Sequence, residues 1–309
     1  MRNKTILITG GTGSLGQQLV KRIVKKCPRK VIVYSRNEFF QVEMSREYPK
    51  PFPVRFFIGD IRDINRLEMA LIGVDIVIHC AALKHVDVAE YNPFEAVKTN
   101  VIGTQNVIEA SIKQGVERVL SISSDKAVDP GNLYGATKLC ADKLIEHAGS
   151  YAGKNGTKFA TIRFGNFWGS SGSVVPYFEK LKRENAEFLP ITSYEMTRFF
   201  IQTDDAVSRI FEALELMKGG EIFCPKMTSV KIKEVAEMVA LKMPTREVGI
   251  RKGEKLHEKM LTSAEIAQTY VHKNFYIING RGKKVSPNFV YSSENHTGLD
   301  SGYTRLIST

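Results

Sequence analysis

The sequence predicts an α/β protein built on a doubly wound parallel sheet, followed by a smaller C-terminal α/β lobe. Two observations predict this fold. Short β-branched runs alternate with longer amphipathic stretches from Thr5 to about Phe164, which is the pattern of repeated βαβ units. The first of these runs leads directly into a glycine-rich turn. We therefore expect one domain over residues 1–165 and a second lobe over 166–309, interleaved with the first.

The strands are expected where β-branched and apolar residues cluster: Thr5–Thr9, Val31–Tyr34, Arg55–Ile58, Ile76–His79, Arg118–Ile122 and Phe159–Arg163. The stretch from Asn92 to Gln114 opens with Asn-Pro and repeats apolar residues at helical spacing, which predicts one long helix against the sheet. Beyond Gly165 the segments Asp204–Met217 and Lys231–Met243 predict amphipathic helices. No element is predicted from about residue 285 to the end.

Composition excludes several classes of protein. With 309 residues, 43% hydrophobic and 25% charged, the chain is neither disordered, nor a coiled coil, nor a small disulfide scaffold. The four cysteines are far apart without a CxxC pair, which is typical of a reducing compartment. The six histidines form no HExxH pair or Cys/His cluster, so we expect no metal.

Hydropathy and charge narrow the possible partners. No apolar run reaches the ~18 to 20 residues of a membrane span, and a first strand at Thr5 leaves no room for a signal peptide. We therefore expect a cytoplasmic protein with no membrane partner. The net charge of +11 favours an anionic partner, either nucleic acid or a phosphate-bearing metabolite.

The glycine-rich turn predicts a dinucleotide site. Glycines between a strand and a helix permit a tight turn and let backbone N–H groups approach a pyrophosphate at the helix N-terminus. The candidate residues are Gly10, Thr12, Gly13, Ser14, Leu15 and Gly16. Glycine-rich turns alone are common, but the position of this one after a strand favours a Rossmann-type cofactor domain over residues 1–165.

The cofactor is predicted to be NADP. About 20 residues beyond the turn, where NAD-selective folds usually carry an acid, this chain has Ser35-Arg36. A guanidinium pairs with the 2′-phosphate, which a carboxylate would repel. The alternative is that Arg36 is an ordinary surface charge. Asp60 and Ile61, after the third strand, are expected beside the adenine.

A Tyr and a Lys predict oxidation chemistry. Tyr134 and Lys138 lie one helical turn apart on one face. The lysine's charge is expected to lower the pKa of the phenol from ~10, making Tyr134 a base for a substrate hydroxyl. Tyr and Lys at this spacing also occur on ordinary helix surfaces. Downstream of the glycine loop, however, the pair resembles that of extended short-chain dehydrogenases/reductases.

The segment from Ser124 to Lys138 sharpens this resemblance. It is similar to the DKAxxPxNxYGxxK pattern of inverting UDP-N-acetylglucosamine 4,6-dehydratases, the first enzymes of pseudaminic-acid synthesis. Further similar blocks are Ala81–His85, Arg163–Asn166, Gly172–Pro176, Met196–Phe199 and Arg251–Glu258, so the resemblance covers roughly residues 1–265. It implies bound NADP, a UDP-sugar substrate, a homo-oligomer (dimer or hexamer) and a product destined for flagellin glycosylation.

The resemblance also implies roles for individual residues. Tyr134 removes the C4 hydroxyl proton while C4 is oxidised, and Lys126 then removes the C5 proton. Asp125 helps to protonate the departing C6 hydroxyl, and hydride returns to C6. Lys126 needs a depressed pKa for this role, which burial and Lys138 are expected to supply. Asp125 and Lys126 could instead simply cap the following loop.

The remaining contacts are also assigned by resemblance. Ala81, Lys84, Tyr134 and Lys138 join the cofactor site, and the substrate contacts are Lys84, Asn166, Val174, Arg198, Arg251 and Glu254. Ordinary surface or loop-bracing roles are the alternative for each substrate contact.

Two features depart from the family: Ser171 stands where many relatives have Arg, and the C-terminal tail is unlike the usual ending. Three alternatives to an inverting dehydratase stay open: a nucleotide-sugar epimerase, a dehydratase that retains C5 configuration, and a catalytically silent NADP-binding regulator. The pair Asp125-Lys126 is the feature that discriminates against the first two, and retention of Tyr134 and Lys138 argues against the third. A nucleic-acid-binding protein lacks support, because no RNP-like motif or zinc finger is present.

Overall fold

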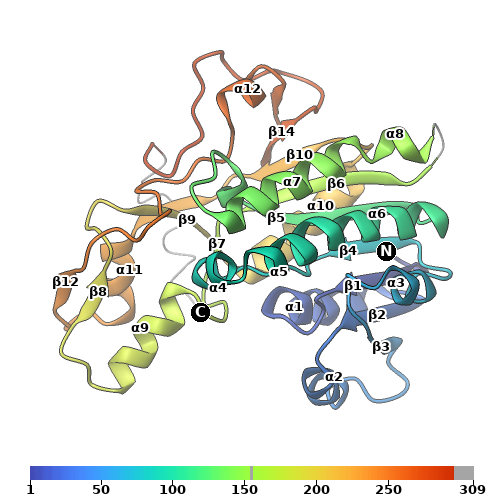
Figure 1. Cartoon of the computed structure of the whole chain (residues 1–309), viewed down its shortest axis with the longest axis horizontal. Coiled ribbons are helices and arrows are strands. Elements are labelled where there is room, and N and C mark those ends of the chain that lie inside the picture. Colours follow the sequence, from blue (N-terminus) through green and yellow to red (C-terminus); the bar gives the residue numbers. More distant parts are fainter. Residues whose placement is uncertain (154–155, 296–309) are drawn as a thin grey trace.

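A twisted nine-stranded sheet forms the centre of the molecule (Figure 1). The computed structural model describes residues 1–153 and 156–295. The sheet order is β13-β14-β10-β6-β5-β4-β1-β2-β3. The strands are β1 (Thr5–Thr9), β2 (Lys30–Ser35), β3 (Val54–Ile58), β4 (Ile76–His79), β5 (Arg118–Ser124), β6 (Lys158–Phe164), β10 (Ile222–Pro225), β13 (Thr269–Val271) and β14 (Phe275–Ile278).

The predicted doubly wound parallel sheet is confirmed. Strands β1 to β6 and β10 are parallel, and the strand order reverses between β1 and β4. At one edge, β14 and β13 run antiparallel to their neighbours. All six predicted strands are present, and β5 continues two residues further than expected, through Ser124. Ligands of such sheets bind beyond the carboxyl ends of the strands at the reversal point.

Helices cover both faces of the sheet, as strands with apolar residues on both sides require. On one face, α1 (Ser14–Ile23) and α10 (Thr203–Leu216) pack over Ile6 and Ile8. On the other, α3 (Ile64–Ala70), α6 (Gly103–Lys113) and α7 (Leu133–His147) pack over Leu7. The remaining short helices of this half are η1 (Val24–Lys26), α2 (Glu38–Ser45), η3 (Asp125–Ala127) and α8 (Gly149–Ala152).

The long helix predicted over 92–114 is interrupted. After α4 (Val86–Tyr91), the chain forms α5 (Pro93–Val97), one π-helical turn η2 (Lys98–Ile102) and then α6. A π turn inserts an extra residue and is frequent at functional sites. Here it accompanies the burial of Asn100, whose side chain bonds to the N–H (2.8 Å) and carbonyl (2.9 Å) of Leu83. The π turn therefore fixes the loop after β4.

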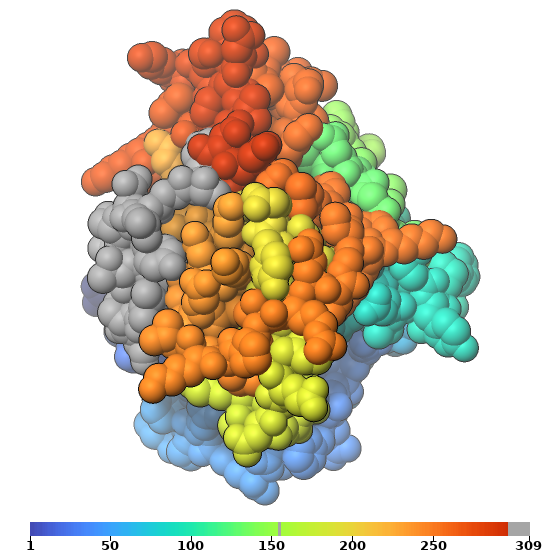
Figure 2. Space-filling model, turned by 90° about the vertical axis from the view of Figure 1, so that its left-hand side faces the viewer, coloured from blue at the N-terminus to red at the C-terminus, as the bar shows by residue number. Residues whose placement is uncertain are grey.

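The smaller lobe has its own core. Its elements are β7 (Asn166–Phe167), α9 (Val174–Arg183), β8 (Leu189–Ile191), β9 (Thr197–Ile201), β11 (Thr228–Lys231), α11 (Ile232–Val239), β12 (Thr245–Glu247) and α12 (Ser263–Ile266). Three strands pair in the order β11-β9-β7, and β12 pairs with β8. In the space-filling view, yellow and orange segments of this lobe lie side by side (Figure 2).

The helix predicted over Lys231–Met243 ends earlier, at Val239, because Ala240 leaves the helical conformation (φ −149°). A helix ending at Met243 was also unfavourable, because Met243 precedes Pro244 and the residue before a proline disfavours the helical conformation. The helix predicted over Asp204–Met217 is confirmed as α10. No helix or strand follows β14 as far as residue 295, and residues 296–309 of the predicted unstructured tail lie outside the described residues.

A buried ion triad joins three of these elements. Arg163 on β6 is fully buried and its Nε donates to Asp142 Oδ2 on α7 (2.9 Å). Its two terminal nitrogens donate to the carboxylate of Glu265 on α12 (3.0 and 2.9 Å). Because buried charges are costly unless paired, this geometry requires all three residues together.

We predict that Arg163→Met destabilises the protein by about 3–5 kcal/mol, because two buried carboxylates lose their counter-charge. The measurement is the free energy of unfolding in urea. Arg46→Met is the control: Arg46 is 70% exposed in its pair with Glu43, so a loss below about 0.5 kcal/mol is expected. Equal effects of the two substitutions would contradict the assignment.

Candidate active site

One cleft of about 1100 Å³ lies between the carboxyl ends of the parallel strands and the smaller lobe. It contains residues from both halves of the chain, including the glycine loop, the start of α7 and the loop before α12. Except for Asp125, every predicted site residue lines it. The residues predicted from the sequence therefore form one continuous site.

The glycine loop fits a dinucleotide. Gly10 has φ +65°, and a Cβ there would lie 2.9 Å from the backbone of Ala81; a Cβ on Gly16 would lie 2.5 Å from Gly11. Gly13 caps α1 without any side-chain hydrogen bond, and no acid occupies the first turn. The helix N-terminus therefore presents free N–H groups to the cleft, as a pyrophosphate requires.

The expected 2′-phosphate site lies at the ends of β2 and β3. Arg36 is half-exposed, and its Nη1 lies 3.6 Å from Asp60 Oδ2. Arg62 also holds Asp60, with Nη2 at 2.7 Å from Oδ2. Burial opposes ionisation of Asp60, but the two guanidinium groups outweigh it and hold its pKa below the ordinary value. Asp60 is thus paired with Arg62 as well as with Arg36, so Arg62 would keep it neutralised if Arg36 turned toward a phosphate.

Ser171 lies beside the cleft, between Ser170 and Gly172, which line it. Its carbonyl accepts a hydrogen bond from Lys84 Nζ (2.8 Å), and its Oγ lies 3.4 Å from Ser14 Oγ in the glycine loop. Gly172 follows with φ +73°, and a Cβ there would collide with the ring of His85. Ser171, expected to depart from the family pattern, thus places a small side chain where three segments meet.

Tyr134 and Lys138 lie on the buried face of α7. Asn132 caps this helix, because its Oδ1 accepts from Gly135 N (2.9 Å). Lys138 Nζ donates to the carbonyl of Ile122 at the end of β5 (2.8 Å). Burial lowers the pKa of Lys138, with Asp142 and Cys80 opposing.

The electrostatics of Tyr134 differ from the prediction. Burial raises the pKa of the phenol, and the groups that oppose this rise most are Lys126 and the Ser124 hydroxyl. The expectation that Lys138 lowers this pKa is thus corrected, because its ammonium is bonded to a carbonyl on the β5 side. The cation that acts to lower the pKa of Tyr134 is Lys126.

Asp125 and Lys126 form a close pair in η3. Lys126 Nζ lies 3.0 Å from Asp125 Oδ1 and 3.4 Å from Asn166 Oδ1. Asp125 is fully buried behind Lys126, and its Oδ1 also accepts from Ser124 Oγ (2.9 Å). Asp125 therefore reaches the cleft only through Ser124 and Lys126.

The predicted depression of the pKa of Lys126 is wrong. Burial lowers this pKa, as expected, but Asp125 and Glu258 outweigh burial and raise it above its ordinary value. Arg198, and not Lys138, is the nearby cation that opposes them. Lys126 is accordingly an ammonium in the free protein.

The predicted substrate residues surround the far side of the cleft. Asn166, Val174, Arg198, Arg251 and Glu254 all line it. Arg198 is 4% exposed and donates to three carbonyl oxygens, of Thr197 (2.7 Å), Leu256 (3.0 Å) and Lys255 (2.8 Å). Arg198 therefore also braces the loop that carries Arg251 and Glu254.

Sequence reasoning missed three contributors. Ser124 bonds to Asp125 and lowers the pKa of Tyr134. Asn100 holds the loop that carries Lys84, and Glu258 lines the cleft beside Lys126. Ser124 and Glu258 stand inside the motifs quoted above, so their position was a usable signal; Asn100 had none.

The described residues also contain no group of three or more His, Cys, Asp or Glu side chains arranged for a metal. All four cysteines are free. Within residues 1–153 and 156–295, no helix is both long enough and apolar enough to span a bilayer.

Comparison with known proteins agrees with this arrangement. The sequence profile of the polysaccharide biosynthesis protein family matches residues 6–280. The chain belongs to this family. It is 46% identical to the inverting UDP-N-acetylglucosamine 4,6-dehydratase of Campylobacter jejuni subsp. jejuni serotype O:2, over 95% of this chain and 93% of that protein. It is also 36% identical to a UDP-glucose 4-epimerase of Rickettsia bellii, over 98% of this chain and 91% of that protein.

Solved structures with the same fold include relatives of this chain. Pen from Bacillus thuringiensis has a TM-score of 0.93 and 37% identity, covering 100% of this chain and 99% of that one. DesIV, a dTDP-glucose 4,6-dehydratase from Streptomyces venezuelae with NAD bound, has a TM-score of 0.74 and 25% identity over 82% of this chain and 86% of that one. The predicted resemblance is confirmed.

We predict that Gly16→Ala weakens binding of the nicotinamide nucleotide by at least about tenfold, because the new methyl group collides with backbone at Gly11. Calorimetric titration measures the effect. Gly149→Ala is the matched control, since a Cβ there meets nothing within 4 Å. Unchanged affinity in Gly16→Ala would refute the nucleotide site.

Proposed function

We propose that the protein is an NADP-dependent hydro-lyase that dehydrates UDP-N-acetylglucosamine with inversion at C5. The product is a UDP-2-acetamido-2,6-dideoxy-hexos-4-ulose. The observation that carries the proposal is the Asp125–Lys126 pair in the cleft that contains Tyr134. Epimerisation at C4 needs one base, for the C4 hydroxyl, whereas loss of water also needs one for C5. The 46% identity to an inverting dehydratase supports the same assignment.

The residues divide the reaction into two stages. A nicotinamide nucleotide, held by the glycine loop and its neighbours in residues 1–165, would supply a reversible acceptor for the hydride that leaves C4 and later reaches C6. In the first stage, Tyr134 accepts the C4 hydroxyl proton. The C4 ketone acidifies C5–H, and in the second stage Lys126 accepts that proton while the C6 hydroxyl leaves as water. Reprotonation at C5 on the opposite face completes the inversion, with no net redox change.

The Asp125–Lys126 pair supplies both an acid and a base. Transfer of one proton across the 3.0 Å from Lys126 Nζ to Asp125 Oδ1 gives a neutral amine and a neutral acid. The amine then accepts the C5 proton, and the Asp125 proton reaches the departing hydroxyl through Ser124, which lines the cleft. Asp125 thus acts as a proton source behind Ser124 and does not itself touch the sugar.

The two halves of the chain are proposed to divide the binding work. Residues 1–165 hold the cofactor through the glycine loop, Ser35, Arg36, Asp60, Ile61, Ala81, Lys84, Tyr134 and Lys138. Residues 166–309, together with Lys84, hold the UDP-sugar through Asn166, Val174, Arg198, Arg251 and Glu254. We also propose a cytoplasmic homo-oligomer whose product enters pseudaminic-acid synthesis for flagellin glycosylation, because the sequence blocks resemble enzymes of that pathway.

A UDP-glucose 4-epimerase is the second candidate, supported by the 36% identity to the Rickettsia bellii protein. Mass spectrometry and NMR after separate incubations with UDP-N-acetylglucosamine and with UDP-glucose distinguish the two. Loss of one water supports the dehydratase, whereas an unchanged mass with a changed C4 configuration supports the epimerase. In deuterated water, NMR of the product then reports deuterium at C5 and its configuration, which separates inversion from retention.

We predict that Arg36→Ala weakens NADP⁺ binding by about 10- to 100-fold, because one charged hydrogen-bond partner of the 2′-phosphate is lost. NAD⁺ affinity should stay constant. Calorimetric titration of both nucleotides checks this, with Arg46→Ala, just after α2, as a control outside the cleft. An equal loss for both nucleotides would contradict the NADP assignment.

We predict that Tyr134→Phe lowers turnover by about 100-fold or more while the cofactor stays bound, because a general base is removed. In the wild-type enzyme, burial raises the pKa of Tyr134. The tyrosinate fraction, and with it the rate of C4 oxidation, should therefore rise between about pH 7 and pH 9. Stopped-flow absorbance of the reduced nicotinamide measures that rate. Near-normal turnover by Tyr134→Phe would remove it from the mechanism.

A further inference from the structure

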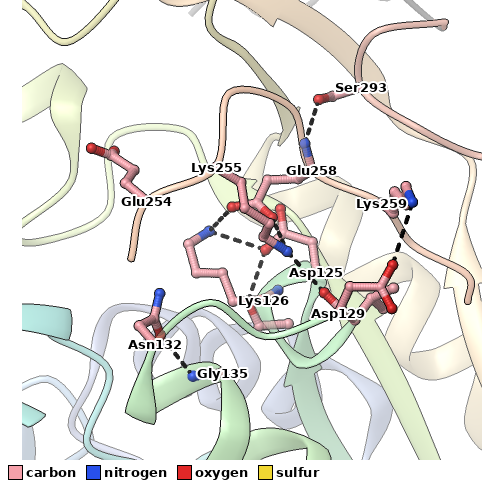
Figure 3. Close-up of polar contacts among 12 residues, drawn as sticks. Asp125, Lys126, Asp129, Asn132, Gly135, Glu254, Lys255, Glu258, Lys259 and Ser293 are labelled. Atoms are coloured by element: carbon pink, nitrogen blue, oxygen red, sulfur yellow. Dashed lines mark hydrogen bonds and ion pairs between the residues drawn. The ribbon is translucent and has the colours of Figure 1, made fainter. Parts of the chain in front are cut away.

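Glu258 is a buried acid that the chemistry above does not use. It ends the block Arg251–Glu258 and is only 2% exposed. Its Oε1 lies 3.8 Å from Lys126 Nζ and 3.9 Å from Arg198 Nε, and its Oε2 lies 2.8 Å from Lys255 Nζ. Figure 3 shows Lys126 reaching toward the carboxylates of Asp125 and Glu258, while Glu254 lies apart.

This arrangement encloses the Lys126 ammonium between two carboxylates from different parts of the fold. Asp125 belongs to η3 at the end of β5, whereas Glu258 comes from the loop before α12. The backbone of Glu258 is fixed, because its N–H donates to Ser293 Oγ (2.9 Å). Lys255 is fixed in turn, because its Nζ donates to the carbonyl of Val128 (2.8 Å). The Glu258 carboxylate is therefore held in place from both sides.

We propose that Glu258 is a positioning residue that holds Lys126 between two carboxylates and keeps the proton on Lys126 while Tyr134 acts. The inference rests on the proposed function and deepens it. Lys126 then has two successive forms. As an ammonium it assists ionisation of Tyr134 in the first stage, and as a neutral amine it accepts the C5 proton in the second.

The charges around Lys126 support this order. Asp125 and Glu258 favour the ammonium, and Arg198 on β9 opposes it. Tyr134 on α7 is the group that gains, since the charge of Lys126 lowers the pKa of its phenol. Lys255 partly neutralises Glu258 and so limits its effect on Lys126. Removing the Glu258 charge should therefore ease proton loss from Lys126, which favours the second stage, and should weaken the first stage only where Lys126 has become neutral.

A substrate analogue separates the stages. UDP-N-acetyl-6-deoxyglucosamine lacks the C6 hydroxyl, so it permits C4 oxidation and C5 proton exchange but no loss of water. Absorbance of the reduced nicotinamide reports C4 oxidation by Tyr134. Incorporation of solvent deuterium at C5 reports the base, Lys126. Both are measured as single turnovers across the pH range, with Lys126→Ala as the reference that oxidises C4 more slowly than wild type and does not exchange C5.

The substitution Glu258→Gln keeps the shape of the side chain and removes its negative charge. The acid limb of C5 exchange should move to lower pH by about one unit, because a neighbouring opposite charge is removed from Lys126. C4 oxidation should lose rate only at the alkaline end of its profile, where Lys126 has become neutral and no longer favours ionisation of Tyr134. Glu212→Gln is the matched control: Glu212 pairs with Arg209 (2.9 Å) outside the cleft, and both profiles should match wild type.

A second variant guards against loss of fold. Lys255→Met leaves Glu258 less neutralised, so the C5-exchange limb should move to higher pH, opposite to its shift in Glu258→Gln. Unchanged profiles in folded Glu258→Gln, or a parallel loss of both stages without any shift, would overturn the proposal. If wild-type protein fails to dehydrate UDP-N-acetylglucosamine in the mass assay, the proposed function itself fails, and that result is separate from these profiles.

Discussion

Parallel pairing of β5 with β4 and β6 fixes the positions of the reactive groups in the cleft. Because the carboxyl ends of neighbouring parallel strands meet at one edge, Ser124 and Asp125 at the end of β5 lie directly beside Asn166, which follows β6. Lys126 Nζ contacts both Asp125 and Asn166. A register shift in this pairing would separate groups that now lie within hydrogen-bonding distance.

The proposed chemistry also depends on how the charged side chains at this edge of the sheet neutralise one another. Lys126, Arg198 and Lys255 surround Glu258, while Asp125 lies behind Lys126. None of these five side chains is more than 25% exposed, so each charge is set by its neighbours more than by solvent. The raised pKa of Lys126 follows from this balance, and it means that Lys126 carries a proton that it must lose before it can act as a base.

Much of the fold and site could be predicted from local sequence. Strand runs, the glycine loop and the Tyr134–Lys138 spacing are local patterns, and all of them hold in the structure. The π turn at 98–102 could not be predicted, because no local pattern marks it and the contact that accompanies it, between Asn100 and Leu83, is tertiary. The predicted pKa shifts of Tyr134 and Lys126 were wrong for the same reason. The charges that act on Tyr134 and Lys126 are set by packing of distant segments, with Glu258 lying 132 residues from Lys126 along the chain (258 − 126).

The buried triad of Arg163, Asp142 and Glu265 has a further consequence for motion. Arg163 connects α7, the helix that carries Tyr134, to α12. The two helices therefore cannot separate without leaving a buried charge unpaired. Local opening of the C-terminal segment and loosening of the catalytic helix are thereby coupled into one cooperative unit. Two segments that are distant in the chain, around residues 142 and 265, should therefore exchange their amide hydrogens with solvent at a common rate.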